Sequence, residues 1–125
     1  MKLTDIQKEN IEKWCVELET TDKQQGIGDL CRDNKFCCLG IACELFGAVK
    51  TPGIYSDELV CYEKEIKLLP ERIRNILGID RGGTLCTEVI VGSRHIGTLY
   101  QLNDSGLFTF PEIARIIREQ FLNVD

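Results

Sequence analysis

The sequence predicts an α+β fold in which four or five helices pack with a small antiparallel sheet or hairpin in a single domain, residues 1–125. Two observations predict this fold: a helix-start signal lies near each end of the chain, and a short strand–turn–strand pattern lies between them. The chain is 43% hydrophobic. A chain of this length buries about two-thirds of its unfolded surface, which is enough for one core.

The N-terminal helix is predicted over residues 5–19. Thr4 and Gln7 have the spacing of a capping box. The apolar residues that follow lie on one helical face: Ile11, Trp14, Cys15 and Leu18. After a polar connector, the segment GIGDLCRDNKFCC predicts two short strands joined at Asp33-Asn34, because these residue types tolerate tight turns.

A second helix is predicted from Leu39 to Gly47, since its apolar stripe ends at a glycine that easily forms a left-handed cap. The segment 50–67 is predicted to be irregular, with some strand between Ile54 and Tyr62, because β-branched and aromatic residues occur there without regular alternation. An exposed part of that strand would let two chains share a sheet, so a homo-oligomer is one expectation.

The third helix is predicted in LLPERIRNILG, where Pro70 suits the first turn and Gly78 supplies the end. LCTEVIVG then predicts a strand. The next segment, HIGTLYQLNDSG, fits either a strand or a short helix that ends near Gly106. Three apolar residues at helical spacing favour the helix: Ile96, Leu99 and Leu102.

The C-terminal helix begins with a second capping box, formed by Thr109 and Glu112, and has Pro111 in its first turn. Its apolar face consists of Phe110, Ile113, Ala114, Ile117 and Phe121. We expect this helix to end near Leu122.

Composition excludes several classes of protein. The longest uncharged apolar run, residues 36–43, is far shorter than the roughly 20 residues of a membrane-spanning helix. MKLTDIQKEN carries acids where a signal peptide has an apolar stretch, so we expect a cytoplasmic protein with no membrane contact. The net charge of −5 disfavours direct binding to nucleic acid, which requires clustered lysine and arginine.

The seven cysteines predict buried, reduced thiols, because the count is odd and no export signal is present. We predict no metal site and no cofactor, since no C-x2-C pair occurs and Cys37 and Cys38 would point to opposite faces of a strand. A catalytic pair of Cys37 or Cys38 with His95 can be drawn. No spacing requires it, so we do not expect an enzyme.

Two polar motifs each have a structural and a functional interpretation. In FCCLG a strand passes into a helix whose free N–H groups near Gly40 suit an anion, and Gly40 equally permits close helix packing. In LNDSG, three polar residues either bond back to the chain and cap a turn or present hydrogen-bonding groups to a ribose or base edge: Asn103, Asp104 and Ser105.

FCCLGIACELFG, LP at the head of a helix, and LND-x-G with F-x-E-I-A downstream resemble a family of small tailed-phage and prophage proteins that has no established shared activity. The resemblance covers residues 25–47, 69–78 and 99–117. The matching positions are Gln25, Phe36, Cys37, Cys38, Leu39, Gly40, Leu102, Asn103, Asp104, Gly106, Phe110 and Ile113. The resemblance implies a viral setting, in which small proteins without enzyme motifs commonly act against host defences.

We therefore expect a non-catalytic protein that sequesters a small anionic nucleotide-type signal of a host defence pathway in the bacterial cytoplasm. The residues expected at the ligand are Gln25, Cys37, Gly40, Arg94, Asn103 and Asp104. Backbone N–H groups near Gly40 would bind phosphate, Arg94 would be a charged clamp, and Asn103 or Asp104 would bind sugar or base. The alternative is an inhibitor or adaptor that applies an acidic surface to a basic host protein.

Overall fold

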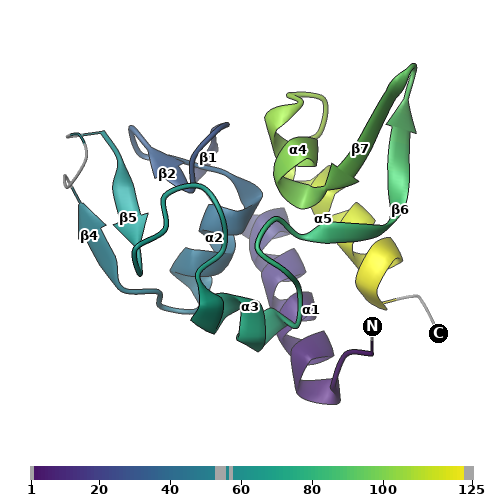
Figure 1. The fold of residues 1–125 in the computed structure, drawn as a ribbon, viewed down its shortest axis with the longest axis horizontal. Coiled ribbons are helices and arrows are strands. Elements are labelled where there is room, and N and C mark those ends of the chain that lie inside the picture. The colour runs from purple at the N-terminus through teal and green to yellow at the C-terminus, as the bar shows by residue number, and fades with distance from the viewer. Residues whose placement is uncertain (1, 53–55, 57, 123–125) are drawn as a thin grey trace.

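The computed structural model describes residues 2–52, 56 and 58–122 and has the α+β fold that the sequence predicts (Figure 1). Within these residues the elements follow in the order α1 (Asp5–Thr20), β1 (Gln24–Gln25), β2 (Cys31–Arg32), β3 (Lys35–Phe36), α2 (Cys38–Leu45), β4 (Lys50–Pro52), β5 (Val60–Tyr62), α3 (Glu71–Leu77), β6 (Thr84–Val91), β7 (Arg94–Thr98), α4 (Leu99–Asp104), α5 (Phe110–Ile117) and a π-helix (Arg118–Leu122).

In the described part of the chain, the strands form three small sheets, where the sequence predicted one. The strand β1 runs parallel to β3, and β2 pairs with β3 in the antiparallel direction. The pairs β4–β5 and β6–β7 are separate antiparallel hairpins, which lie at the left and right of the view in Figure 1. Because most of these strands have only two or three residues, the helices supply most of the core.

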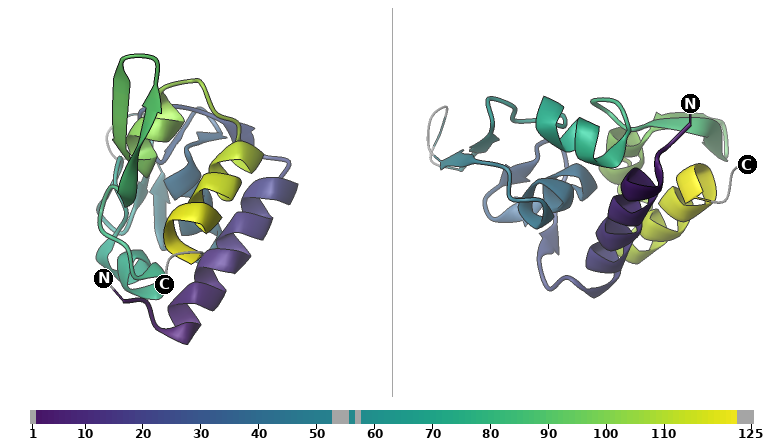
Figure 2. Two further views of the ribbon diagram at one scale, coloured as in Figure 1. Left: turned by 90° about the vertical axis from the view of Figure 1, so that its right-hand side faces the viewer. Right: turned by 90° about the horizontal axis from the view of Figure 1, so that it is seen from below.

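Both predicted capping boxes are present, which confirms the starts of α1 and α5. The Thr4 side chain accepts from the Gln7 N–H, and the Gln7 side chain accepts from the Thr4 N–H. Thr109 and Glu112 make the same reciprocal pair at α5. The helix-start signals thus identified two helices, α1 and α5, that lie side by side (Figure 2).

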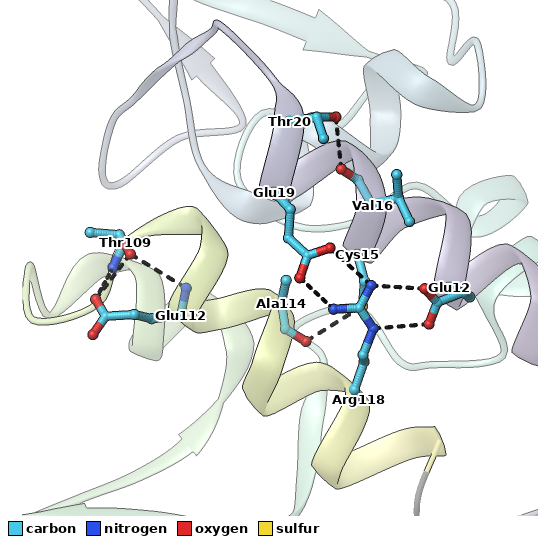
Figure 3. Close-up of polar contacts among 9 residues, drawn as sticks. All are labelled: Glu12, Cys15, Val16, Glu19, Thr20, Thr109, Glu112, Ala114 and Arg118. Atoms are coloured by element: carbon cyan, nitrogen blue, oxygen red, sulfur yellow. Dashed lines mark hydrogen bonds and ion pairs between the residues drawn. The ribbon is translucent and has the colours of Figure 1, made fainter.

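Arg118, in the π-helix that continues α5, joins the C-terminal end of the chain to α1 (Figure 3). Its guanidinium donates to Glu12 at 2.8 Å and to Glu19 at 3.0 Å, and these hydrogen bonds lower the pKa of both carboxyl groups. Beside them, the Cys15 thiol donates to the Ala114 carbonyl at 3.5 Å. Polar bonds therefore fix the position of α1 against the last helical segment.

The predicted hairpin turn at Asp33-Asn34 is confirmed. Both residues have positive φ, 57° and 61°, as a two-residue turn of the primed type requires. The prediction of a polar connector over TTDKQQG, residues 20–26, was wrong in part, because Gln24–Gln25 pairs with β3 as strand β1. Two polar residues carry no alternation, so only this pairing identifies the strand.

The prediction that Cys37 and Cys38 face opposite sides of a strand was wrong. Cys37 is the N-cap of α2, Cys38 is its first residue, and both side chains are buried. The helix ends at Leu45, and Gly47 adopts a φ of 68° shortly after it. The predicted glycine termination of α2 is therefore confirmed.

The segment predicted as one helix from Ile96 onward divides into a strand and a helix. Residues Arg94–Thr98 form β7, in which Ile96 pairs with Val89 of β6. The Thr98 side chain then accepts from the backbone of α4 and caps its start. The apolar spacing was misleading because both residues are buried from different elements, Ile96 from the strand β7 and Leu99 from the helix α4.

The strand β5 and the helix α3 lie where the sequence predicted a strand and a third helix. Val60–Tyr62 forms β5 and pairs with β4, whereas Ile54, Tyr55 and Asp57 lie outside the described residues. The helix α3 begins directly after Pro70 and ends at Gly78, whose φ is 73°. Among the helices of the described part of the chain, no one combines the length and the apolar character needed to cross a membrane.

Candidate functional site

Asn103 is the centre of a buried hydrogen-bond network that joins α4 to β1 and α2. The side chain is fully buried, and its Oδ1 accepts from Gln25 Nε2 at 2.9 Å and from the Cys38 N–H at 3.1 Å. Its Nδ2 donates to the Gly26 carbonyl at 2.8 Å. We call these four residues the Asn103 network. Because both ends of the carboxamide are used internally, Asn103 stabilises the fold.

The backbone N–H of Gly40 is directed into the protein. It donates to the Cys37 Sγ at 3.3 Å, so this sulfur acts as the cap of α2. A Cβ on Gly40 would lie 1.9 Å from the Leu30 carbonyl oxygen, which shows how closely the helix approaches the chain before β2. Gly40 is buried and its amide is occupied, so the predicted phosphate contact at this amide does not fit the geometry.

Asp104 follows Asn103 at the end of α4 and faces a pocket of about 230 Å³. Its Oδ1 accepts from the Gly28 N–H at 2.9 Å and from Asn103 Nδ2 at 3.3 Å. Its Oδ2 has no donor among the described residues and remains able to accept a hydrogen bond. We call this space the Lys67 pocket, and its lining consists of Gly28, Cys37, Lys67, Leu68, Tyr100 and Asp104.

A second pocket, also about 230 Å³, has Tyr100 and Asp104 in its lining as the Lys67 pocket does. We call it the Arg94 pocket, and its lining includes Arg94, His95, Ile96 and Gln101 together with Tyr100 and Asp104. Tyr100 and Asp104 are four residues apart on α4, so they lie on one helical face and form a shared wall. We call this pair the α4 ridge.

The Tyr100 side chain lies close to the loop before β6. Its backbone N–H donates to the Gly82 carbonyl at 3.3 Å, and a Cβ on Gly82 would lie 3.0 Å from the ring. The side chain is nevertheless 36% exposed. The ring is therefore next to this loop and exposes about a third of its surface, so a planar group could stack on it.

Burial makes the cysteines near the site poor nucleophiles. It raises the pKa of the Cys37 thiol to about 12 and that of Cys38 well above its ordinary value. Both groups are therefore thiols at neutral pH. His95 and Cys37 line different pockets, the Arg94 pocket and the Lys67 pocket. The His95 imidazole Nδ1 instead lies 3.5 Å from a Glu88 carboxylate oxygen.

The structure brings the six residues selected from the sequence into one region, but these residues differ in how deeply they are buried. Cys37, Gly40 and Asn103 are buried, Gln25 and Asp104 are partly buried, and of the six residues only Arg94 is exposed. Sequence reasoning missed Lys67 and Tyr100. The spacing of Tyr100 and Asp104 on a helix was a usable signal, but nothing in the segment 50–67 indicated Lys67.

No group of three or more histidine, cysteine, aspartate or glutamate side chains within residues 2–52, 56 and 58–122 has an arrangement that could hold a metal ion.

The family model described as a domain of unknown function, DUF8296, matches residues 6–121. This match extends from α1 into the π-helix and includes both pockets and the α4 ridge. No curated protein matches the sequence, and no solved structure matches it.

Proposed function

The chain belongs to the family of the domain of unknown function DUF8296, and we propose that it is a non-catalytic binding protein for a small anionic nucleotide-type ligand. The observation that supports this proposal is the α4 ridge, because its exposed aromatic ring and its carboxylate line two pockets, each of which also has a cationic side chain in its lining. Concave sites with a few convergent polar groups are the usual location of small ligands.

The chemistry of the ridge suits the parts of a nucleotide. An aromatic side chain such as Tyr100 stacks on a base, and such stacking contributes about 1–3 kcal/mol per base. The Asp104 Oδ2 is an acceptor for a ribose hydroxyl or a base amino group. Lys67 and Arg94 are donors for phosphate, and hydrogen bonds between such charged groups are roughly twice as strong as neutral ones.

The resemblance to small phage proteins suggests what such binding would accomplish. A protein that holds a nucleotide without converting it lowers the free concentration of that nucleotide by mass action. If the ligand is a signal of a host defence pathway, sequestration in the bacterial cytoplasm would prevent activation of the effector. We therefore propose an anti-defence role that depends on affinity and protein abundance and not on turnover.

A second candidate function is an inhibitor or adaptor that binds a host protein. Ile27 and Leu107 are exposed apolar residues beside a third hollow of about 280 Å³, which also has Gln25 and Phe108 in its lining. The net charge of −5 would favour a basic partner. Association would then weaken as salt is raised, because screening reduces attraction between charged surfaces.

Native mass spectrometry tests the proposed function. The protein is purified from bacteria with induced defence signalling, and any retained small molecule is released by denaturation and identified. We expect a nucleotide-sized adduct on the unmodified protein and on Tyr100→Phe, which keeps the ring, and we expect its loss in Tyr100→Leu. Val49→Ala, an exposed change outside both pockets, is the matched control and should keep the adduct.

The two candidate functions predict different results in this experiment. Retention of the same adduct by Tyr100→Leu would contradict binding at the α4 ridge. A bare chain mass in every sample, together with salt-sensitive recovery of one host protein that Ile27→Asp abolishes, would favour the inhibitor or adaptor.

A further inference from the structure

The size of the two pockets limits how a nucleotide can bind. Each pocket is about 230 Å³, which is below the roughly 300–1,000 Å³ of typical ligand pockets. A nucleotide confined to one pocket would leave part of its surface in water. A ligand that crosses the α4 ridge and enters both pockets would bury more of its surface and contact Tyr100 along its middle.

The cations in the two pockets are available to an external anion. Arg94 makes no ion pair with an acid of the described residues, and Lys67 is 4.0 Å from its nearest carboxylate oxygen, on Asp29. Asp29 already accepts from Arg32 at 2.7 Å. By contrast, the guanidinium groups of Arg72 and Arg118 each lie 2.8 Å from a carboxylate. Lys67 and Arg94 thus differ from the arginines that hold the fold together.

The two cations determine which charged groups a ligand must carry in order to contact both pockets. Lys67 is the lysine or arginine in the lining of one pocket, and Arg94 is the lysine or arginine in the lining of the other. Tyr100 and Asp104 belong to both linings. A ligand that satisfies all four groups therefore has an anionic group at each end and a ring with a hydroxyl or amino group in the middle.

We infer that the ligand is a nucleotide with two separated phosphate groups, one bound at Lys67 and the other at Arg94, with the nucleoside between them on Tyr100. This inference rests on the proposed function and specifies its ligand class. A nucleoside 3′,5′-bisphosphate is the simplest compound with this chemistry, and a 5′-monophosphate lacks one of its two ends.

Titration calorimetry with these compounds tests the inference. The probes are the 3′,5′-bisphosphates of adenosine, guanosine, cytidine and uridine, each compared with its own 5′-monophosphate. For at least one base we expect the bisphosphate to bind about tenfold more tightly, as one additional charge-assisted hydrogen bond provides. Lys67→Ala and Arg94→Gln should each weaken the bisphosphate about tenfold, whereas only one of them should weaken the monophosphate.

Two controls distinguish loss of binding from loss of fold. Lys8→Ala removes an exposed lysine on α1 and should leave both affinities unchanged. Thermal unfolding of Lys67→Ala and Arg94→Gln should match that of the unmodified protein, because both side chains are exposed. Lys67→Met and Arg94→Lys are second variants: the first removes the charge but keeps the length, and the second keeps the charge and should restore part of the affinity.

Two results would overturn the inference in different ways. Equal affinity for the bisphosphate and monophosphate, with sensitivity to only one of the two cations, would place the ligand in one pocket and leave the proposed function intact. Absence of binding by all eight probes, with no adduct in native mass spectrometry, would overturn both the inference and the proposed function.

Discussion

Asn103 and Asp104 are neighbours in the same motif, but the structure surrounds them very differently. Asn103 is fully buried and bonds to Gln25, Gly26 and the start of α2. Asp104 lines both pockets, accepts from the Gly28 N–H through Oδ1, and has no donor at Oδ2 among the described residues. Adjacent residues of one polar motif thus have different roles, because they lie at different positions around α4. The Asn103 side chain stabilises the scaffold, and the Asp104 side chain remains available to a ligand.

The largest effect that this comparison predicts is destabilisation by Asn103→Ala. The change leaves the buried Cys38 N–H and the partly buried Gly26 carbonyl without their side-chain partner, and an unsatisfied buried group costs about 1–3 kcal/mol. We expect the free energy of unfolding to fall by about 3 kcal/mol, measured by urea denaturation followed by circular dichroism. A loss below about 1 kcal/mol would show that water or local movement replaces the Asn103 network.

Gly40→Ala is the next test, since it addresses the packing that brings α2 to this network. The new Cβ would lie 1.9 Å from the Leu30 carbonyl oxygen, and overpacking of this kind costs about 1–3 kcal/mol. Alanine recovers up to about 1 kcal/mol through its higher helix propensity. We expect a net loss of about 2 kcal/mol in urea unfolding. An unchanged or increased stability would mean that the helix N-terminus has room to move.

Helix starts and glycine terminations were predictable because their signals are local. Thr4 with Gln7, and Thr109 with Glu112, act within one helical turn, and Gly78 ends α3 through its own backbone conformation. The strand β1 was not predictable, since Gln24–Gln25 becomes a strand only by pairing with β3. Local chemistry therefore identified most of the helical scaffold and the β2–β3 hairpin, but not β1, which is a strand only through its pairing with β3.

The candidate site was predictable only in part for the same reason. LNDSG suggested a polar cluster, but the burial of Asn103 depends on Gln25 and α2, which the sequence does not join to it. Lys67 lines the same pocket as the α4 ridge, but it lies in an irregular segment whose sequence has no periodic pattern. Tyr100 was hidden because an aromatic residue in an apolar helical pattern is most often part of a core.

The smallest expected effect is that of Asp104→Asn, and it provides the most direct test of the comparison. The substituted side chain keeps an oxygen that can accept from the Gly28 N–H, and the position is only partly buried. We therefore expect the free energy of unfolding to change by no more than about 0.5 kcal/mol. Urea unfolding beside Asn103→Ala under identical conditions measures the difference. If Asp104→Asn destabilised the protein as much as Asn103→Ala, the carboxylate would be part of the scaffold, and its Oδ2 would not be available to a ligand hydroxyl.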